Sequence, residues 1–235
     1  MIDTLRNLGK IMALASSMEK FFFVHIPKNA GTSFKTLLRG DNAPLKNFIT
    51  YISHSAPSEY FTQAKKRIIV LREPGERFCS AFYFRLSYSR ACLEWAKENK
   101  INSPEEYIRY LIVTKQRWNP IMSHGADHQS VAGILIAPTV WVFQPQSLWF
   151  RSPNTVLLHK DLNVEWKFFC DATGVPFIDL PRINISQNSL NSHNSALGSE
   201  SISFLRHIYS GDYALWDVLG SMRVNDRTQM KQGKE

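Results

Sequence analysis

Small residues, one lysine and two hydroxyl side chains lie together in the segment Pro27–Ser33, which reads PKNAGTS. The apolar run Phe21–Ile26 before it is typical of a buried strand, and the residues after it have helical spacing. A loop of small residues between a strand and a helix turns its backbone N–H groups toward one point, where the helix N-terminus adds partial positive charge. With the charge of Lys28 and the hydroxyl groups of Thr32 and Ser33, this segment is a candidate phosphate-binding loop. The alternative is an ordinary strand-to-helix turn with a surface lysine.

The candidate loop differs from the Walker A loop of ATP-binding proteins, G-x-x-x-x-G-K-[ST]. In this chain Lys28 precedes Gly31, the one glycine of the segment. The next long apolar run, Arg67–Leu71, is followed by Arg72, where a Walker B strand would supply an aspartate for Mg²⁺. The sequence therefore predicts an anion held by lysine and arginine, without a metal.

Arg72 begins a second candidate anion site. Ligands of open α/β sheets bind at the carboxyl ends of the strands, and a guanidinium donates two parallel hydrogen bonds to anionic oxygens. Ser80 lies eight residues further on, in a predicted helix from which it can face the same crevice. Arg77 and Arg85 of that helix are expected to be solvated charges. Two anion sites, each after a buried strand, fit a ligand that has two separated phosphates.

These residues need a scaffold of strands and helices to position them. Two strand–loop–helix units in series predict an α/β fold with a P-loop-like parallel sheet flanked by helices. We expect strands at 21–26, 48–52, 67–71 and 155–158, and helices at 34–39, 57–64, 78–86, 93–99, 104–113 and 164–173, with a turn at 72–75 and a loop at 181–195. A last helix is expected at 202–209, either continued or restarted over 212–219. We predict an N-terminal extension at 1–17 with Met18 as a candidate natural start, one domain at 18–222 and a polar C-terminal tail at 223–235.

The composition excludes several classes of protein. The chain has 235 residues, of which 44% are hydrophobic, so it can bury a core and is not disordered. The 28 Lys and Arg exceed the 20 Asp and Glu, and the net charge of +8 indicates an anionic partner: a nucleic acid, a membrane surface, an acidic polysaccharide or a phosphorylated cofactor. We expect no membrane span, because no apolar run is long enough. Cys79, Cys92 and Cys170 form no C-x-x-C motif and are expected to be buried free thiols of a cytoplasmic protein.

Two motifs resemble those of a known family. The segment His25–Ser33 resembles the 5′-phosphosulfate loop of sulfotransferases that use 3′-phosphoadenosine 5′-phosphosulfate (PAPS), and the pattern Arg72-Glu73-Pro74-x-x-Arg77-x-x-Ser80-x-x-Tyr83 resembles their 3′-phosphate motif. The similarity is strongest to the heparan and uronyl 2-O-sulfotransferases and the chondroitin-type carbohydrate sulfotransferases. Weaker similarity continues in Arg182–Ser186 and Ile208–Tyr213. The resemblance implies the sulfotransferase fold.

The resemblance also implies roles for individual residues. Lys28 would contact the bridging oxygen and the 5′-phosphate, Arg72 and Ser80 would hold the 3′-phosphate, and His54 occupies the place of the general base. The remaining nucleotide contacts would come from Asn29, Ala30, Gly31, Thr32, Ser33 and Ser186. Two positions depart from the family pattern: Glu73 replaces an aspartate, and Leu158-His159-Lys160-Asp161 stands where the family has a glutamate. The second departure leaves the acceptor side open.

The predicted function is in-line transfer of a sulfuryl group from PAPS to an acceptor hydroxyl on a carbohydrate or other small molecule. His54 would be the general base, and 3′-phosphoadenosine 5′-phosphate (PAP) the product, with no metal and no nucleic-acid partner. One alternative is an ATP-using small-molecule kinase, and another is a non-enzymatic basic module that binds nucleic acid or acidic glycan.

Two further groups of residues are open to more than one interpretation. His124 and His128 are four residues apart, but a zinc site needs three or four ligands, so we expect acceptor contact or a structural role. The tryptophans of the middle region could stack on a sugar ring or pack in the core: Trp95, Trp118, Trp141 and Trp149.

Overall fold

The computed structural model describes residues 20–39, 44–52, 66–114, 143–150, 154–181, 183 and 197–232. Contacts divide the chain into two compact units. Unit 1 consists of Met1–Leu71 and Trp149–Asn184, and unit 2 consists of Arg72–Leu148 and Ile185–Glu235. Among the described residues, no helix has the length and apolar character that crossing a membrane requires.

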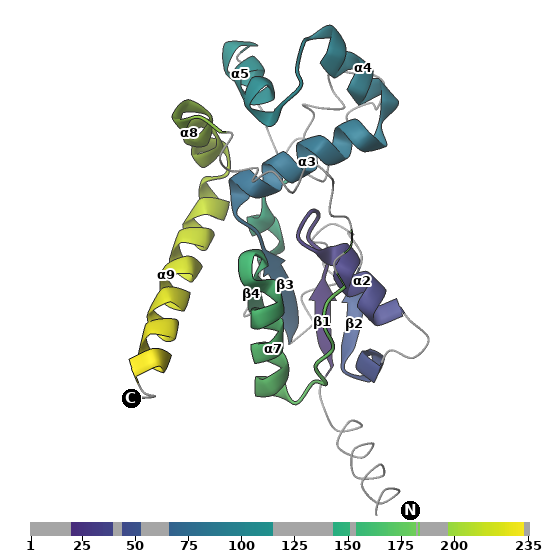
Figure 1. The fold of residues 1–235 in the computed structure, drawn as a ribbon, viewed down its shortest axis with the longest axis vertical. Coiled ribbons are helices and arrows are strands. Elements are labelled where there is room, and N and C mark those ends of the chain that lie inside the picture. Colours follow the sequence, from purple (N-terminus) through teal and green to yellow (C-terminus); the bar gives the residue numbers. More distant parts are fainter. Residues whose placement is uncertain are drawn as a thin grey trace, which may run out of the picture. The chain divides into compact units, whose positions relative to one another are not determined.

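Unit 1 is built on a parallel four-stranded sheet with the strand order β2-β1-β3-β4 (Figure 1). The strands are β1 (Phe21–Val24), β2 (Ile49–Ile52), β3 (Arg67–Leu71) and β4 (Asn154–Leu158). The register places Phe23 beside Ile68 of β3. A parallel sheet flanked by helices confirms the predicted fold class. The chain passes from β1 to β2 on one side and later returns to β3 on the other, so the topological switch point lies between β1 and β3.

Aromatic packing attaches two helices to this sheet. Helix α2 (Gly31–Arg39) stacks Phe34 on Phe23 of β1, with 4.0 Å between the ring centroids. Helix α7 (Leu162–Thr173) packs Trp166 against Phe34 in a T-shaped pair, with a centroid separation of 5.3 Å. The Trp166 indole N–H donates to the carbonyl of Ile178 at 2.9 Å, so this buried ring is also satisfied as a donor. These contacts hold the start of α2 directly after β1. Two short 3₁₀ turns complete the unit: η1 (Pro44–Asn47) and η5 (His159–Asp161).

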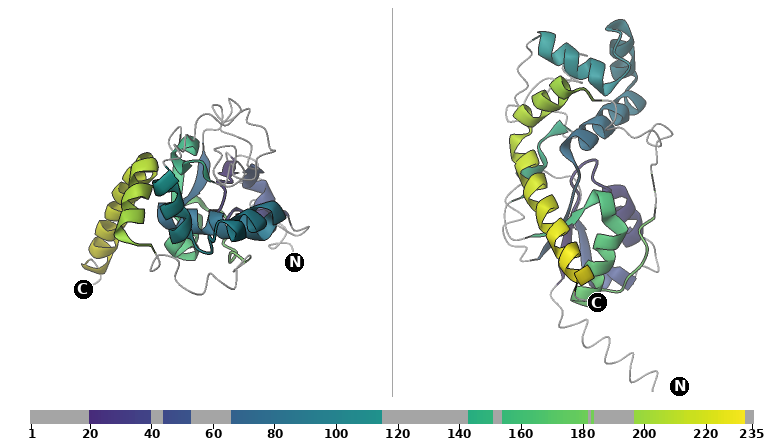
Figure 2. Two further views of the ribbon diagram at one scale, coloured as in Figure 1. Left: turned by 90° about the horizontal axis from the view of Figure 1, so that it is seen from above. Right: turned by 60° about the vertical axis from the view of Figure 1, so that its left-hand side comes forward.

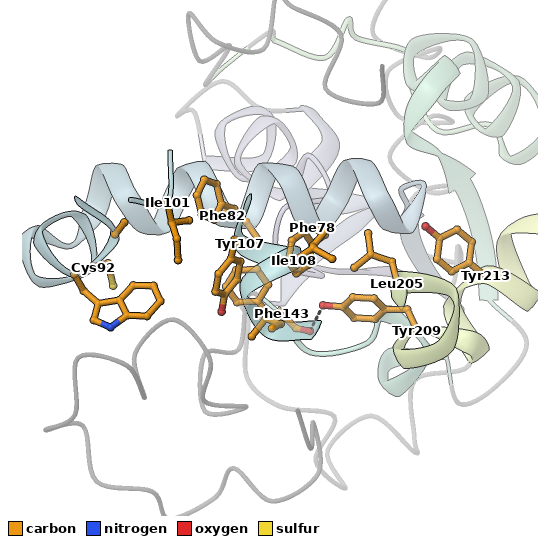
Figure 3. Close-up of a cluster of buried hydrophobic side chains, with 14 residues drawn as sticks. Phe78, Phe82, Cys92, Ile101, Tyr107, Ile108, Phe143, Leu205, Tyr209 and Tyr213 are labelled. Carbon is orange, nitrogen blue, oxygen red and sulfur yellow. Dashed lines mark hydrogen bonds between the residues drawn. The ribbon is translucent and has the colours of Figure 1, made fainter. Parts of the chain in front are cut away.

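Unit 2 is helical and has its own core. It contains α3 (Pro74–Tyr88), α4 (Arg90–Glu98), α5 (Pro104–Thr114), α8 (Ser199–Ile208) and α9 (Ser210–Gln232), and most of the 3₁₀ turn η4 (Gln146–Trp149). Figure 3 shows Phe78, Phe82 and Tyr107 in this core, together with the Tyr209 hydroxyl, which donates to the carbonyl of Phe143 at 2.7 Å. The chain leaves helical geometry at Tyr209 and turns from α8 into the long α9 (Figure 2).

The four predicted strands all form, and β3 has the predicted bounds. Helix α3 begins four residues earlier than predicted, at Pro74, inside the expected turn. Its N-cap is Glu73, whose side chain accepts from the Glu76 N–H at 2.6 Å, and proline suits the first helical position. Glu73 thus provides the cap although the family pattern has an aspartate there.

Helix α9 continues to Gln232, past the predicted end at residue 219. The helix predicted at 57–64 and most of the loop predicted at 181–195 lie outside the described residues. Helix α7 ends as predicted, because Gly174 adopts a left-handed φ of 74°. Cys79, Cys92 and Cys170 are buried and free, which confirms the expected thiols.

Candidate functional site

The loop between β1 and α2 has an unusual backbone. It leaves the carboxyl end of β1, next to the switch point of the sheet. Lys28 and Ala30 have φ angles of 67° and 57°, in the left-handed region that non-glycine residues avoid. Such strain costs about 1–3 kcal/mol per residue and is concentrated at ligand sites. Left-handed residues that alternate with ordinary ones turn successive N–H groups into a concavity that binds anions.

Asn29 anchors this loop to the sheet. Its side chain is buried, and Nδ2 donates to the carbonyl of Val70 on β3 at 2.6 Å. Its backbone N–H donates to the carbonyl of Ile26 at 3.3 Å. Through these two hydrogen bonds Asn29 holds its left-handed neighbours, Lys28 and Ala30, in place.

His25 fixes the start of α2 through Gly31. A Cβ atom at position 31 would lie 1.7 Å from Cδ2 and 1.8 Å from Nε2 of His25, so only glycine fits. Nδ1 of His25 shares a hydrogen bond with the hydroxyl of Tyr51 on β2 at 2.5 Å. Burial raises the pKa of Tyr51, although nearby Arg39 opposes the shift, so the phenol stays neutral. The His25–Tyr51 pair supports the N-terminus of α2 from the adjacent strand.

The first amides of α2 complete the concavity. Ser33 and Phe34 donate the first intrahelical hydrogen bonds, both to the carbonyl of Ala30, at 3.0 and 3.3 Å. The amides of Gly31 and Thr32 precede these bonds and lie where a helix N-terminus presents its N–H groups to an anion. The structure therefore brings together all six residues that were predicted for the loop: Lys28, Asn29, Ala30, Gly31, Thr32 and Ser33.

In unit 2, the segment that begins at Arg72 is the second candidate anion site. The Arg72 side chain is mostly buried, and its Nε lies 3.6 Å from Oε2 of Glu76. Burial lowers the pKa of Arg72, and Glu76 partly offsets this effect. Ser80 follows Glu76 by four residues on α3, so both occupy one face of the helix, and Ser80 is partly exposed. Arg72 precedes the helix and contacts Glu76, and Ser80 lies one helical turn beyond Glu76. The assignment of the 3′-phosphate to Arg72 and Ser80 stays a prediction.

Arg77 corrects an expectation. It was expected to be a solvated charge, yet only 2% of it is exposed. Burial lowers the pKa of Arg77, while Tyr209 and Asp212 raise it and Arg72 lowers it further. The residue faces the inside of unit 2, where α3 and α9 are in contact, so its charge is structural. Arg85 is partly buried and donates from Nη2 to the Sγ atom of Cys92 at 3.4 Å.

Other candidates are either core residues or lie outside the described part of the chain. Trp95 and Trp149 are buried in the core, so neither presents a ring face to a sugar. The residues on which the structure gives no information are His54, Trp118, His124, His128, Trp141 and Ser186. Within the described ranges no group of three or more His, Cys, Asp or Glu side chains could hold a metal ion.

The structure adds three residues to which no motif of the sequence assigns a role. His159 follows β4 directly, at the same carboxyl edge of the sheet as the loop after β1. A histidine directly after a predicted strand was the signal that could have found it. Gln146 and Asp212 are both fully buried: Gln146 is hydrogen-bonded to the backbone of Arg72, and Asp212 accepts from the N–H of Gln146. No local pattern marks these two, because their contacts join residues that are far apart in the sequence.

The comparison with protein families identifies the family of the chain. A model described as the sulfotransferase family matches residues 13–217, which include both candidate anion sites. The chain belongs to the sulfotransferase family. No curated protein and no solved structure matches it. The similarity of this sulfotransferase to the heparan, uronyl and chondroitin-type enzymes stays a prediction.

Gly31→Ala is expected to distort the candidate anion loop of this sulfotransferase, because the new methyl group would collide with His25. Overpacking of this kind costs about 1–3 kcal/mol, and we expect PAP affinity to fall by about 10-fold or more. Titration calorimetry measures it. The matched control is Gly220→Ala in α9, where an added Cβ meets nothing within 4 Å, so PAP affinity should not change. Equal affinities of both variants for PAP would show that the loop does not depend on the contact between His25 and Gly31.

Proposed function

We propose that this sulfotransferase moves a sulfuryl group from PAPS to a hydroxyl group of a carbohydrate or other small molecule. The observation that carries the proposal is the backbone of the loop after β1. Left-handed Lys28 and Ala30 bracket an anchored Asn29 at the start of α2, in a chain that belongs to the family. This arrangement suits a phosphate group better than an ordinary turn, because an ordinary turn has no need of backbone strain.

The two phosphates of the donor would have separate partners. We assign the 5′-phosphosulfate to Lys28 and to the amides and hydroxyls of Gly31, Thr32 and Ser33. The 3′-phosphate would bind Arg72 and Ser80, since a partly buried guanidinium lacks full hydration and gains from an anionic oxygen. Ser186 would contact the nucleotide from the later loop.

The reaction breaks the bond between sulfur and the oxygen that bridges it to the 5′-phosphate, and it forms a bond between sulfur and the acceptor oxygen. Negative charge grows on the bridging oxygen as it leaves, where the ammonium group of Lys28 and the loop amides would stabilise it. The leaving group is a phosphate and needs no metal to depart. His54 would take the acceptor's proton, because a histidine accepts a proton near neutral pH.

We also propose that the enzyme works in the cytoplasm. The three buried cysteines are free, as is usual for thiols in a reducing compartment. The acceptor is the least defined partner, because the segment Leu158-His159-Lys160-Asp161 at the end of β4 does not match the glutamate of the family pattern. Transfer of labelled sulfate from PAPS to a panel of sugar, phenolic and lipid hydroxyls would identify it.

A thermal-shift measurement tests the proposed donor directly. A ligand at about 100 times its Kd stabilises the folded state by about 2.7 kcal/mol, so PAP should raise the melting temperature clearly, and Mg-ATP should not. A shift with Mg-ATP alone would favour the kinase. A shift with neither, together with salt-sensitive binding to nucleic acid or acidic glycan, would favour the basic binding module.

A further inference from the structure

The backbone of Arg72 is held by a buried side-chain amide. The Oε1 atom of Gln146 accepts from the Arg72 N–H at 3.0 Å, and Nε2 of Gln146 donates to the Arg72 carbonyl at 2.8 Å. Gln146 is fully buried and lies 74 positions away in the sequence. The amide binds both backbone groups of one residue, as a neighbouring strand would. It therefore fixes the backbone of Arg72 where β3 has just ended.

A carboxylate holds Gln146 in turn. Oδ2 of Asp212 accepts from the Gln146 N–H and Oδ1 accepts from the Ser147 N–H, both at 2.7 Å. Asp212 is fully buried on α9, where an ionised carboxylate is costly unless both oxygens are hydrogen-bonded. These short, charge-assisted bonds are strong ones. The result is a continuous chain from α9 through η4 to Arg72.

We infer that Gln146 and Asp212 are positioning residues that aim Arg72 at the 3′-phosphate of the nucleotide. The inference rests on the proposed function, which assigns that phosphate to Arg72. Bidentate recognition by a guanidinium depends on its direction, because its donors form a rigid planar fork. Glu76 restrains the Arg72 side chain at Nε, and Gln146 restrains the backbone from which that side chain extends. The two restraints act on different parts of one residue.

Comparing the affinities for two nucleotides distinguishes the positioning of Arg72 from a general effect on stability. PAP carries a 3′-phosphate and 5′-AMP does not, so the ratio of their Kd values reports recognition of the 3′-phosphate alone. Gln146→Met keeps the size of the side chain and removes both hydrogen bonds to Arg72. We expect this variant to bind PAP about 10-fold more weakly, the equivalent of one or two lost hydrogen bonds, while its affinity for 5′-AMP stays the same.

Asp212→Asn tests the next link in the chain. Its amide keeps one acceptor oxygen, so the loss of discrimination should be smaller than in Gln146→Met and in the same direction. The matched control is Asp217→Asn on the same helix. Asp217 is exposed and pairs with Arg206 at 3.1 Å, an ion pair of little energetic value, so the Kd ratio should stay that of the wild type.

Combination with Arg72→Ala completes the test. If Gln146 acts through Arg72, the double variant should discriminate no worse than Arg72→Ala alone. The calorimetry is done below the melting temperature of each variant, so that unfolded protein does not affect the Kd values. An unchanged ratio in Gln146→Met, or a further additive loss in the double variant, would overturn the inference and leave the proposed function intact. A wild-type protein that binds PAP no better than 5′-AMP would contradict the assignment of the 3′-phosphate itself.

Discussion

Lys28→Met is expected to lower kcat by about 10²–10³-fold, the usual cost of removing one group that stabilises a departing oxygen. Methionine keeps an unbranched side chain of similar length and removes the charge. It leaves the left-handed backbone as strained as before, because both residues carry a Cβ. PAP affinity should fall much less than kcat, since the charge on the bridging oxygen is greatest in the transition state. Steady-state assays with PAPS and calorimetry with PAP measure the two effects.

Two further variants serve as controls for Lys28→Met. Lys28→Arg keeps the charge but changes the donor geometry, so it should recover part of the lost turnover. Lys46→Ala removes an exposed lysine from η1 in the same unit and should leave kcat unchanged. If Lys28→Met lost PAP affinity while kcat stayed the same, the lysine would bind the nucleotide equally in the ground and transition states. Full turnover in Lys28→Met would exclude Lys28 from the chemistry.

The sheet could be predicted from the sequence because its strands are apolar on both faces. All five residues of β3 are buried, so the apolar run and the strand have the same bounds. The helix ends were less predictable. Pro74 and Gly75 are typical of a turn, but proline also starts helices, and the Glu73 cap decides in favour of the helix. In the polar end of α9, apolar residues do not recur at helical spacing. The continuation of this helix to Gln232 therefore could not be predicted from the sequence pattern.

The candidate anion sites combine residues that are adjacent in the sequence with supporting residues that are far away in it. The loop after β1 is contiguous, and its small residues, lysine and hydroxyls are visible in seven successive positions. Its support is not local: Asn29 reaches Val70, 41 positions away, and His25 reaches Tyr51, 26 positions away. The same holds for Asp212, which binds the Gln146 N–H across 66 positions. Tertiary contacts of this kind leave no spacing signal in the sequence, and for the same reason the sequence does not indicate the burial of Arg77.

His54→Ala is expected to cut kcat by about 10²–10⁴-fold and to leave PAP binding intact, since a general base acts on the acceptor and not on the nucleotide. His54 lies outside the described residues, so its role rests on the family resemblance. The wild-type kcat should fall as pH drops below about 6.5, where an ordinary histidine becomes protonated and cannot accept a proton. The residual activity of His54→Ala should lack this acid limb. A pH profile of both proteins therefore reports the base itself and not only the loss of a side chain.

Variants of two other histidines show whether His54 or another histidine is the general base. His207 is exposed on α8, and His207→Ala should keep the full rate and the acid limb. His159 stands at the carboxyl end of β4, at the edge of the sheet where ligands of parallel α/β folds bind. If His159→Ala lost both turnover and the acid limb while His54→Ala kept them, the proton would be taken from the end of β4. A base at the end of β4 would also fit the departure from the family pattern in Leu158-His159-Lys160-Asp161, because His159 would then accept the acceptor's proton in place of His54.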